Sequence, residues 1–338
     1  MHKAEQERPP WLNTSSPGFS LMTTNAIGID VSKNTLDVAD STGVWTEAYP
    51  NTLDGLGMIL AKAAELKPHR ILLEASGGYE RRALNALYEA GLPVVLIQPN
   101  RARHFARAIG RFAKTDAIDA QVLARMALVA VDEVPLWKPR EEVEQRLRGL
   151  LQRRRQLVRH IDAERKRRRG ADEVVLESIQ RTVAFLKSEQ EDIEGEIEVL
   201  VESSPELSAS SECLTEVCGV GTQTALTLLV EVPELGALSR NAVSSLVGVA
   251  PMNRDSGQYQ GQRFIRGGRV HARTALYMAT LSAIRFNPHI QDFFNRLKER
   301  GKNGKVALVA CMRKMIIHLN AKMRAHRAHI LQRTPMAA

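Results

Sequence analysis

Two aspartates stand three residues apart in the stretch KTDAIDA. On a helix this spacing puts Asp116 and Asp119 side by side, where like charges repel by roughly 0.2–0.5 kcal/mol at a solvated surface. Leu123 and Met126 continue the helical spacing, so both carboxylates lie on or beside a packing face, where a carboxylate needs a cation or a proton. The structural alternative is that Thr115 caps the helix and the two acids only favour its first turn.

Two more acids close apolar segments that read as strands. Asp30 ends IGID and Glu74 ends ILLE. Each of them alone is most simply a strand-end residue that faces water. Together with the helical pair they make four acids on separate elements of one domain, and ligand crevices form at strand ends in open α/β sheets. Carboxylates without His or Cys suit Mg²⁺ or Mn²⁺, and such ions assist phosphoryl transfer.

An α/β domain over residues 25–137 is predicted to position these acids. Short apolar or alternating runs bounded by Gly, Pro and polar turns predict strands, and the segments between them predict helices. The predicted strands are 25–31, 35–40, 69–75 and 92–99, and the predicted helices are 53–66 and 80–90. The sheet is expected to be largely buried.

Composition narrows the class of partner. The 338 residues contain 47 Lys and Arg against 38 Asp and Glu, a net charge of +9, which favours a polyanion such as nucleic acid. Aromatic residues make up only 5%, which argues against a base-stacking platform. Cys213, Cys218 and Cys311 form no CxxC pair, which indicates a reducing cytoplasm and argues against zinc.

The N-terminal segment, residues 1–24, has no apolar signal-peptide core and reads as a disordered leader, with Met22 as an alternative start. No apolar run approaches the length of a membrane span. These features favour a cytoplasmic protein.

Residues 138–204 predict a basic coiled coil of two long helices with heptad seams, which could pair with each other or with another chain. Each seam has one polar interruption, Arg154 in the first helix and Gln190 in the second. The second helix is acidic, whereas the first is strongly basic, which predicts contact with phosphates. The basic positions are Arg153, Arg154, Arg155, Arg165, Lys166, Arg167, Arg168 and Arg169.

A helical domain is predicted over residues 205–325, followed by a tail at 326–338. Its segment TEVCGVGTQTALTLLVEV resembles a helix-hairpin-helix, in which Gly219 and Gly221 would bring backbone N–H groups onto a phosphate. An ordinary tight turn between core helices is the alternative.

A Gly-rich polar loop follows and holds Ser256. A serine before a glycine is usually a turn residue, but planar guanidinium groups around it favour a phosphate site. The arginines are Arg254, Arg263, Arg266, Arg269 and Arg273. A serine nucleophile would need a base, and His271 is the local histidine.

The runs GIDVSKNTLDV, LLEASGGYE and KTDAIDA, followed by GVAP…SG…RGGR…R…LY, resemble the DEDD insertion-sequence transposases of the insertion sequence one-ten family. The resemblance implies a RuvC-like, RNase H-type N-terminal domain. In it Mg²⁺ is held by Asp30, Glu74, Asp116 and Asp119. It also implies that Ser256 attacks a DNA phosphate and becomes covalently linked to it.

The same resemblance implies a bacterial, nucleoid-associated protein that works as a dimer or tetramer, with a structured noncoding RNA that pairs with donor and target DNA. Two other functions fit the residues. A hydrolytic junction-resolving nuclease would use the four acids with water and leave Ser256 idle. A noncatalytic nucleic-acid-binding scaffold would use the acids only as helix caps.

Overall fold

The computed structural model describes residues 25–111, 115–129, 134–257, 259–261 and 263–333. The predicted leader and the last five residues of the predicted tail therefore lie outside the described residues. The chain forms two compact units, Met1–Pro139 and Arg140–Ala338. The division falls beside the boundary expected between residues 137 and 138.

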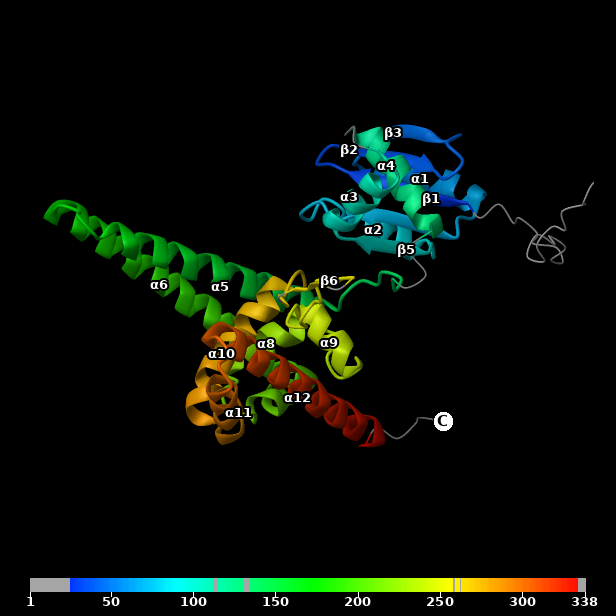
Figure 1. Cartoon of the computed structure of the whole chain (residues 1–338). Helices are drawn as coiled ribbons and strands as arrows, with labels where there is room; N and C mark the ends of the chain where they lie inside the picture. The colour runs from blue at the N-terminus through cyan, green and yellow to red at the C-terminus, as the bar shows by residue number, and fades with distance from the viewer. Residues whose placement is uncertain (1–24, 112–114, 130–133, 258, 262, 334–338) are drawn as a thin grey trace, which may run out of the picture. The chain divides into compact units, whose positions relative to one another are not determined.

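The first unit contains a five-stranded sheet in the order β3-β2-β1-β4-β5 (Figure 1). β1 pairs antiparallel with β2, and β2 pairs antiparallel with β3, whereas β4 and β5 continue the sheet parallel to β1. This mixed sheet fits the RuvC-like α/β fold that the resemblance implies. The strands are β1 (Ala26–Val31), β2 (Thr35–Asp40), β3 (Thr46–Pro50), β4 (Arg70–Glu74) and β5 (Val94–Ile97).

Two elements of this unit were not predicted. β3 has the pattern TEAYP, of which only Tyr49 is buried, so its hydrophobic signal is weak for a strand. α3 (Pro99–Ala108) begins with a proline at its first turn, where the fixed φ of proline suits a helix start. The strand predicted at 92–99 therefore ends earlier, at Ile97.

Helices cover both faces of the sheet. On one face α1 (Leu53–Leu66) and α2 (Arg81–Glu89) pack against alternate strand residues such as Ile29 and Ile71. On the other face α3 and α4 (Asp116–Val129) pack against the intervening ones, such as Leu72. Because side chains alternate along a strand, each residue of β1 and β4 is assigned to one of these two faces.

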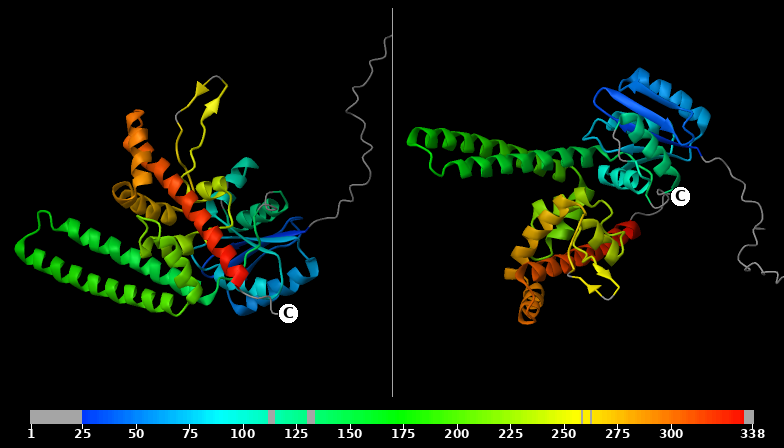
Figure 2. Two further views of the ribbon diagram at one scale, coloured as in Figure 1. Left: turned by 90° about the horizontal axis from the view of Figure 1, so that it is seen from below. Right: turned by 45° about the horizontal axis from the view of Figure 1, so that its top comes forward.

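The second unit begins with a helical hairpin formed by α5 (Glu142–Arg167) and α6 (Glu173–Glu202), seen clearly in Figure 2. The two helices pair with each other, and their buried residues include Leu147, Leu151, Leu157, Ile161, Ile179, Ile197 and Leu200.

The two polar seam residues meet at one carboxylate. Arg154 Nε lies 2.5 Å from Glu194 Oε1, and Gln190 Nε2 donates to the same oxygen at 2.9 Å. Glu194 therefore satisfies both interruptions of the seam, which ties the register of one helix to the other.

Among the described residues the body of this unit is built from α7 (Pro205–Thr215), α8 (Thr222–Glu231), α9 (Arg240–Val247), α10 (Val270–Phe286), α11 (Pro288–Glu299) and α12 (Gly304–Arg333). Their common core includes Leu228, Val247, Leu276, Ile316 and Leu319. α12 continues through residue 325, where we expected the helical domain to end and a tail to begin.

The predicted polar loop forms an arm that leaves this body between α9 and α10 (Figure 2). Two short antiparallel strands, β6 (Asp255–Ser256) and β7 (Tyr259–Gln260), lie near its tip. A bridge between Met252 and Phe264 holds its two sides together lower down.

Candidate active site: an acidic cluster and a serine arm

The sheet places the two strand-borne acids on the face that α4 covers. Asp30 lies two residues beyond Gly28 on β1, and Glu74 lies two residues beyond Leu72 on β4. Gly28 pairs with Leu72, and Leu72 belongs to the core beneath α4. By alternation Asp30 and Glu74 point to the same side of the sheet, toward the helix that carries the other two acids.

Gly28 sets the distance between that helix and the strand. A Cβ at Gly28 would lie 2.7 Å from Leu123 Cβ and would overlap the Ala120 carbonyl oxygen and the Ala124 nitrogen. The backbone of α4 therefore rests directly on the backbone of β1. This contact brings Asp119, the neighbour of Ala120, over Asp30.

The acids converge as a result. Oxygens of Asp30, Asp116 and Asp119 lie within 4.8 Å of one another. Burial and the negative charges of Asp119, Glu74 and Asp116 raise the pKa of Asp30 to about 6. Glu74 is not one of the three residues whose oxygens meet, but its charge is close enough to act on Asp30. A cluster of carboxylate oxygens of this kind fits a hard divalent cation, which would offset their repulsion.

The start of α4 is capped and also carries clustered acids, the two interpretations considered from the sequence. Thr115 Oγ1 accepts a hydrogen bond from the Ile118 N–H at 3.3 Å, as an N-cap does. The capping and the clustering of Asp116 and Asp119 are therefore compatible, because the cap uses Thr115 and leaves both carboxylates beside Asp30.

A fifth acid, Asp37, was not singled out from the sequence. It lies directly opposite Asp30 in the antiparallel pairing of β1 and β2, so both point to the same face. Burial raises the pKa of Asp37, and the charge of Asp116 raises it further. The sequence contains this acid in the predicted strand TLDVAD. Its position opposite Asp30 follows once the turn that joins β1 to β2, and so the register of the two strands, is known.

Ser256 is exposed on the arm, and the base of the arm is held tightly. Gly248 and Gly268 both have positive φ, at 78° and 74°. Their backbones pack closely: a Cβ on Gly248 would overlap the Gly267 carbonyl oxygen, and a Cβ on Gly268 would overlap the backbone of Gly248. Arg273 Nη1 donates to the carbonyl oxygens of Gly267 and Val247. The two ends of the arm are thereby clasped at the start of α10.

The five arginines around Ser256 fall into two groups. Arg269 binds both carboxylate oxygens of Glu234, at 2.5 and 2.7 Å, and Arg273 binds the base of the arm. These two guanidinium groups have internal partners. The other three, which are exposed, are Arg254, Arg263 and Arg266.

The basic positions of the hairpin divide in the same way. Arg154 binds Glu194, Arg155 Nη1 lies 3.2 Å from Glu231 Oε1, and Lys166 Nζ lies 2.6 Å from Asp162. Arg167 pairs with Glu164 one turn away. The exposed positions for which no ion pair is found among the described residues are Arg153, Arg165, Arg168 and Arg169.

The two glycines between α7 and α8 differ. Gly219 has a φ of 99°, and a Cβ there would lie 2.7 Å from Ala283 Cβ and 2.9 Å from the Ala279 oxygen, so this glycine lets the turn pack on α10. Gly221 is the N-cap of α8 and has open space around it. Gly219 therefore makes a packing contact with α10, whereas no atoms of the described residues fill the space beside Gly221.

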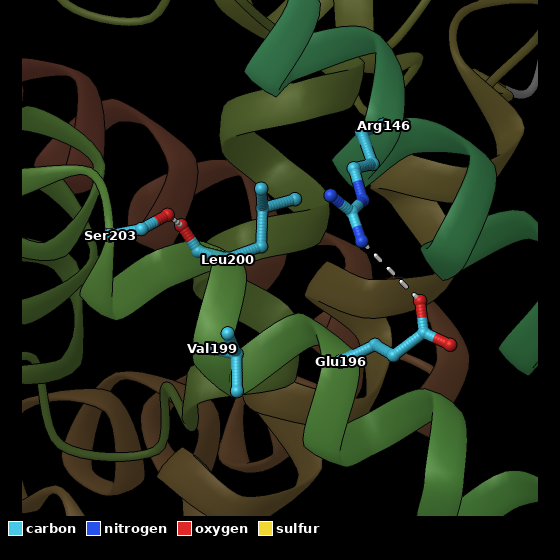
Figure 3. Close-up of a pocket in the computed structure, with 5 residues that line it drawn as sticks. All are labelled: Arg146, Glu196, Val199, Leu200 and Ser203. Atoms are coloured by element: carbon cyan, nitrogen blue, oxygen red, sulfur yellow. Dashed lines mark hydrogen bonds and ion pairs between the residues drawn. The ribbon is translucent and has the colours of Figure 1, made fainter.

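A cavity of the second unit lies away from these residues. It has a volume of about 200 Å³ and lies between α5 and the end of α6, where Arg146 and Glu196 face each other at 3.9 Å (Figure 3). Its lining is completed by Val199, Leu200 and Ser203. Both charged side chains are more than half exposed, so this is an ordinary surface ion pair.

Comparison with known families gives two matches. Residues 27–171 match the DEDD domain of IS110 transposases, and residues 211–295 match a domain described as transposase of the IS116/IS110/IS902 family. The first match contains the four acids, and the second contains Ser256. No helix among the described residues is both long and apolar enough to cross a membrane.

Individual relatives agree with these matches. The chain is 27% identical to the pilin gene-inverting proteins of Moraxella lacunata and Moraxella bovis, over 90% of this chain and 98% of each relative. It is 28% identical to an uncharacterized 43.6 kDa protein of insertion element IS110 from Streptomyces coelicolor, over 46% of this chain and 38% of that protein.

Among solved structures, Thermus thermophilus RuvC is similar at 14% identity, covering 33% of this chain and 99% of RuvC, with a TM-score of 0.28. RuvC from the same organism in complex with a Holliday junction substrate covers 34% of this chain with a TM-score of 0.26.

Proposed function

Because the chain belongs to the IS110 family of transposases, we propose that it cuts and rejoins DNA through a covalent link between Ser256 and a DNA phosphate. Membership of the family makes the chain a DNA transposase or recombinase. The proposal adds the chemistry: a serine nucleophile and a divalent cation, Mg²⁺ or Mn²⁺, held by Asp30, Glu74, Asp116 and Asp119.

The convergence of three carboxylates within 4.8 Å carries this proposal. Such a cluster is costly without a counter-ion, as the raised pKa of Asp30 indicates. Bound divalent ions stabilise the oxygens that attack and leave in a phosphoryl transfer. The protein's own role is to hold the carboxylate oxygens in place, and Gly28 allows α4 to pack closely enough on β1 to do so.

The covalent step conserves the phosphodiester. Ser256 Oγ loses its proton to a base and forms a bond to phosphorus, while the bond from phosphorus to one sugar oxygen breaks and that oxygen takes up a proton. In the reverse direction a sugar hydroxyl from another DNA end displaces the serine. The cut strand can therefore be rejoined without ATP.

The relatives favour rejoining over hydrolysis. Two of them are named pilin gene-inverting proteins and are similar over nearly the whole of both chains. Inversion of a gene segment needs every cut end to be joined again, which a nuclease that uses water does not achieve. Three exposed arginines near Ser256, Arg254, Arg263 and Arg266, offer contacts for phosphates.

The partners in this proposal are donor DNA, target DNA and a structured guide RNA. Backbone contacts suffice for a protein that leaves sequence reading to base pairing. A homo-oligomer, a dimer or tetramer as the family resemblance implies, is also part of the proposal.

The test is to trap the covalent intermediate. The purified protein, with RNA transcribed from beside its gene, is incubated with Mg²⁺ and DNA from the ends of its own genomic element, and then denatured. We expect labelled DNA to stay attached to the wild type and to Ser188→Ala, an exposed serine of α6, but not to Ser256→Ala. Asp119→Asn should abolish the adduct while nucleic-acid binding persists.

Other outcomes select the alternatives. Cleavage by Ser256→Ala at the wild-type rate, with free ends and no adduct, identifies a hydrolytic nuclease. If Asp119→Asn leaves both strand cleavage and the stabilisation by Mg²⁺ unchanged, the acids are structural and the chain is a scaffold.

A further inference from the structure

Three helices of the second unit meet where the hairpin joins the helical body. Arg155 of α5 pairs with Glu231 at the end of α8 at 3.2 Å. Arg140 donates to the carbonyl oxygen of Val230 at 3.0 Å, and Arg269 donates to that of Glu231 at 2.8 Å. These arginines bind the C-terminal end of α8, where the carbonyl groups lack helical partners. They hold α5 and the start of α10 in fixed positions around it.

Two other arginines flank Arg155 on α5. Arg148 precedes it by seven residues and Arg159 follows it by four, so all three lie on one side of the helix. Arg148 and Arg159 are exposed, and neither forms an ion pair with another described residue. The exposed Gln152 lies between them on the same side. At about 1.5 Å per residue the two guanidinium groups are attached about 16 Å apart.

The N-terminus of α10 faces the same region. The first turn contains no acid, and the N-cap residue, Arg269, makes no side-chain capping bond. His271 lies in this turn, and burial followed by the positive charge of Arg155 lowers its pKa. Arg159 and Arg148 lower it further, and Glu231 acts in the opposite direction. The positive potential that opposes a proton on His271 favours an anion there.

We propose that Arg148, Arg159 and the first turn of α10 around His271 form a binding surface for the phosphodiester backbone of a nucleic acid. Arg155 and Arg269 are the internal supports of this surface, because Glu231 and Glu234 already occupy their guanidinium groups. The spacing on α5 corresponds to about five nucleotides of one strand at about 3.4 Å per nucleotide. The inference rests on the proposed function for the presence of nucleic acid, but not for the serine chemistry.

The surface is separate in sequence from the basic run Arg165–Arg169, which stands at the far end of α5, beside the turn of the hairpin. It also lies at the start of the helix that follows the Ser256 arm. A backbone bound here would therefore be held next to the base of the arm, which Arg273 clasps.

The experiment compares two double variants of the full chain. Arg148→Gln with Arg159→Gln removes the two free guanidinium groups, and Arg181→Gln with Lys187→Gln removes the same charge from exposed positions of α6. Binding is measured over a range of salt with two probes, a random-sequence DNA duplex and a folded RNA of similar charge. Thermal unfolding checks that both variants fold.

We expect the Arg148/Arg159 variant to bind at least one probe about tenfold more weakly, with a salt slope smaller by about two, whereas the control keeps the wild-type slope. Loss on the duplex alone identifies DNA as the ligand, loss on the RNA alone identifies RNA, and loss on both identifies a surface that takes either.

Equal affinity and slope in the two variants would overturn the inference, as would a wild type that binds neither probe. The adduct assay on Ser256 is independent of this outcome. A wild type that binds through Arg148 and Arg159 but forms no adduct would retain the surface and remove the serine mechanism.

Discussion

The acidic cluster lies beneath a helix that packs on a strand with no room for a methyl group, whereas Ser256 stands exposed on an arm whose strands near the tip are two residues long. Under the proposed function the acids are metal ligands, which must be held against their own repulsion, and the buried contact of α4 with β1 holds them there. The proposed nucleophile, Ser256, must instead be accessible to a long polymer. The arm accordingly concentrates its close packing at the base, around Gly248, Gly268 and Arg273.

The acidic cluster and the arm also differ in the charged groups that they bring together. Around Asp30, oxygens of Asp116 and Asp119 lie within 4.8 Å of its own, and burial and the negative charges of the neighbouring acids raise its pKa. Around Ser256 each of the two inner arginines, Arg269 and Arg273, has an acceptor within the protein. The first arrangement stores repulsion that a metal can relieve, and the second fixes backbone positions.

The largest expected effect comes from Gly28→Ala. The added methyl group overlaps the backbone of α4, so the helix must move away and separate Asp119 from Asp30. We expect a loss of about 3 kcal/mol or more in stability, together with loss of Mg²⁺-dependent stabilisation and of cleavage. Thermal unfolding with and without Mg²⁺ measures the loss of stability and the loss of Mg²⁺-dependent stabilisation.

Gly57→Ala is the matched control, because it lies in α1 with open space around it and should be neutral or stabilising by up to about 1 kcal/mol. Retention of Mg²⁺-dependent stabilisation by Gly28→Ala would mean that the acids do not depend on this contact.

A smaller effect is expected from the proton on Asp30. Its pKa is about 6 in the folded protein against 3.8 in the unfolded chain, so the folded state binds the proton more tightly. Without metal, the contribution of Asp30 to stability therefore falls as pH rises from about 4 to about 6, by up to about 3 kcal/mol. Since Mg²⁺ needs the ionised carboxylate, its stabilising effect should grow over the same range.

Asp30→Asn should remove both pH dependences and raise the stability of the metal-free protein near neutral pH. Glu65→Gln, an exposed acid of α1, should leave both in place. The measurement is the unfolding temperature of both variants and of the wild type across this pH range, with and without Mg²⁺. Metal-free stability that changes with pH in this window by the same amount in the wild type and in Asp30→Asn would contradict the prediction.

The smallest effect on the acidic cluster is expected from Gly268→Ala. A methyl group there overlaps Val247 and Gly248 and strains a backbone at φ 74°, so the base of the arm opens. We expect the yield of the Ser256 adduct to fall about tenfold or more, since a displacement of about 1 Å at a reacting group costs this much.

Stabilisation by Mg²⁺ should be unchanged in Gly268→Ala, because the acids belong to the other compact unit. Gly267→Ala is a useful comparison, since it has a similar φ but open space around it. If the two variants lose equal amounts of adduct, backbone strain rather than the close contact explains the effect.

Much of the fold follows from local sequence patterns. The apolar runs that became β1, β4 and β5, and the heptad-like spacing that became α5 and α6, each have a period that one kind of element satisfies. β3 was missed because only Tyr49 of its five residues is buried. The strand is completed by pairing with β2, which a local pattern does not contain.

The sequence by itself determined which residue types are available: acids at the ends of β1 and β4, two more in the first turn of α4, a serine that precedes a glycine and an excess of arginine. Tertiary structure alone decided how they are used. Asp37 joins the acids through strand register, Gly28 admits α4, and Glu231 and Glu234 convert two arginines from candidate ligands of phosphate into internal supports. The physical reason is that charge and packing act over a few ångströms in space, and these partners are far apart along the chain.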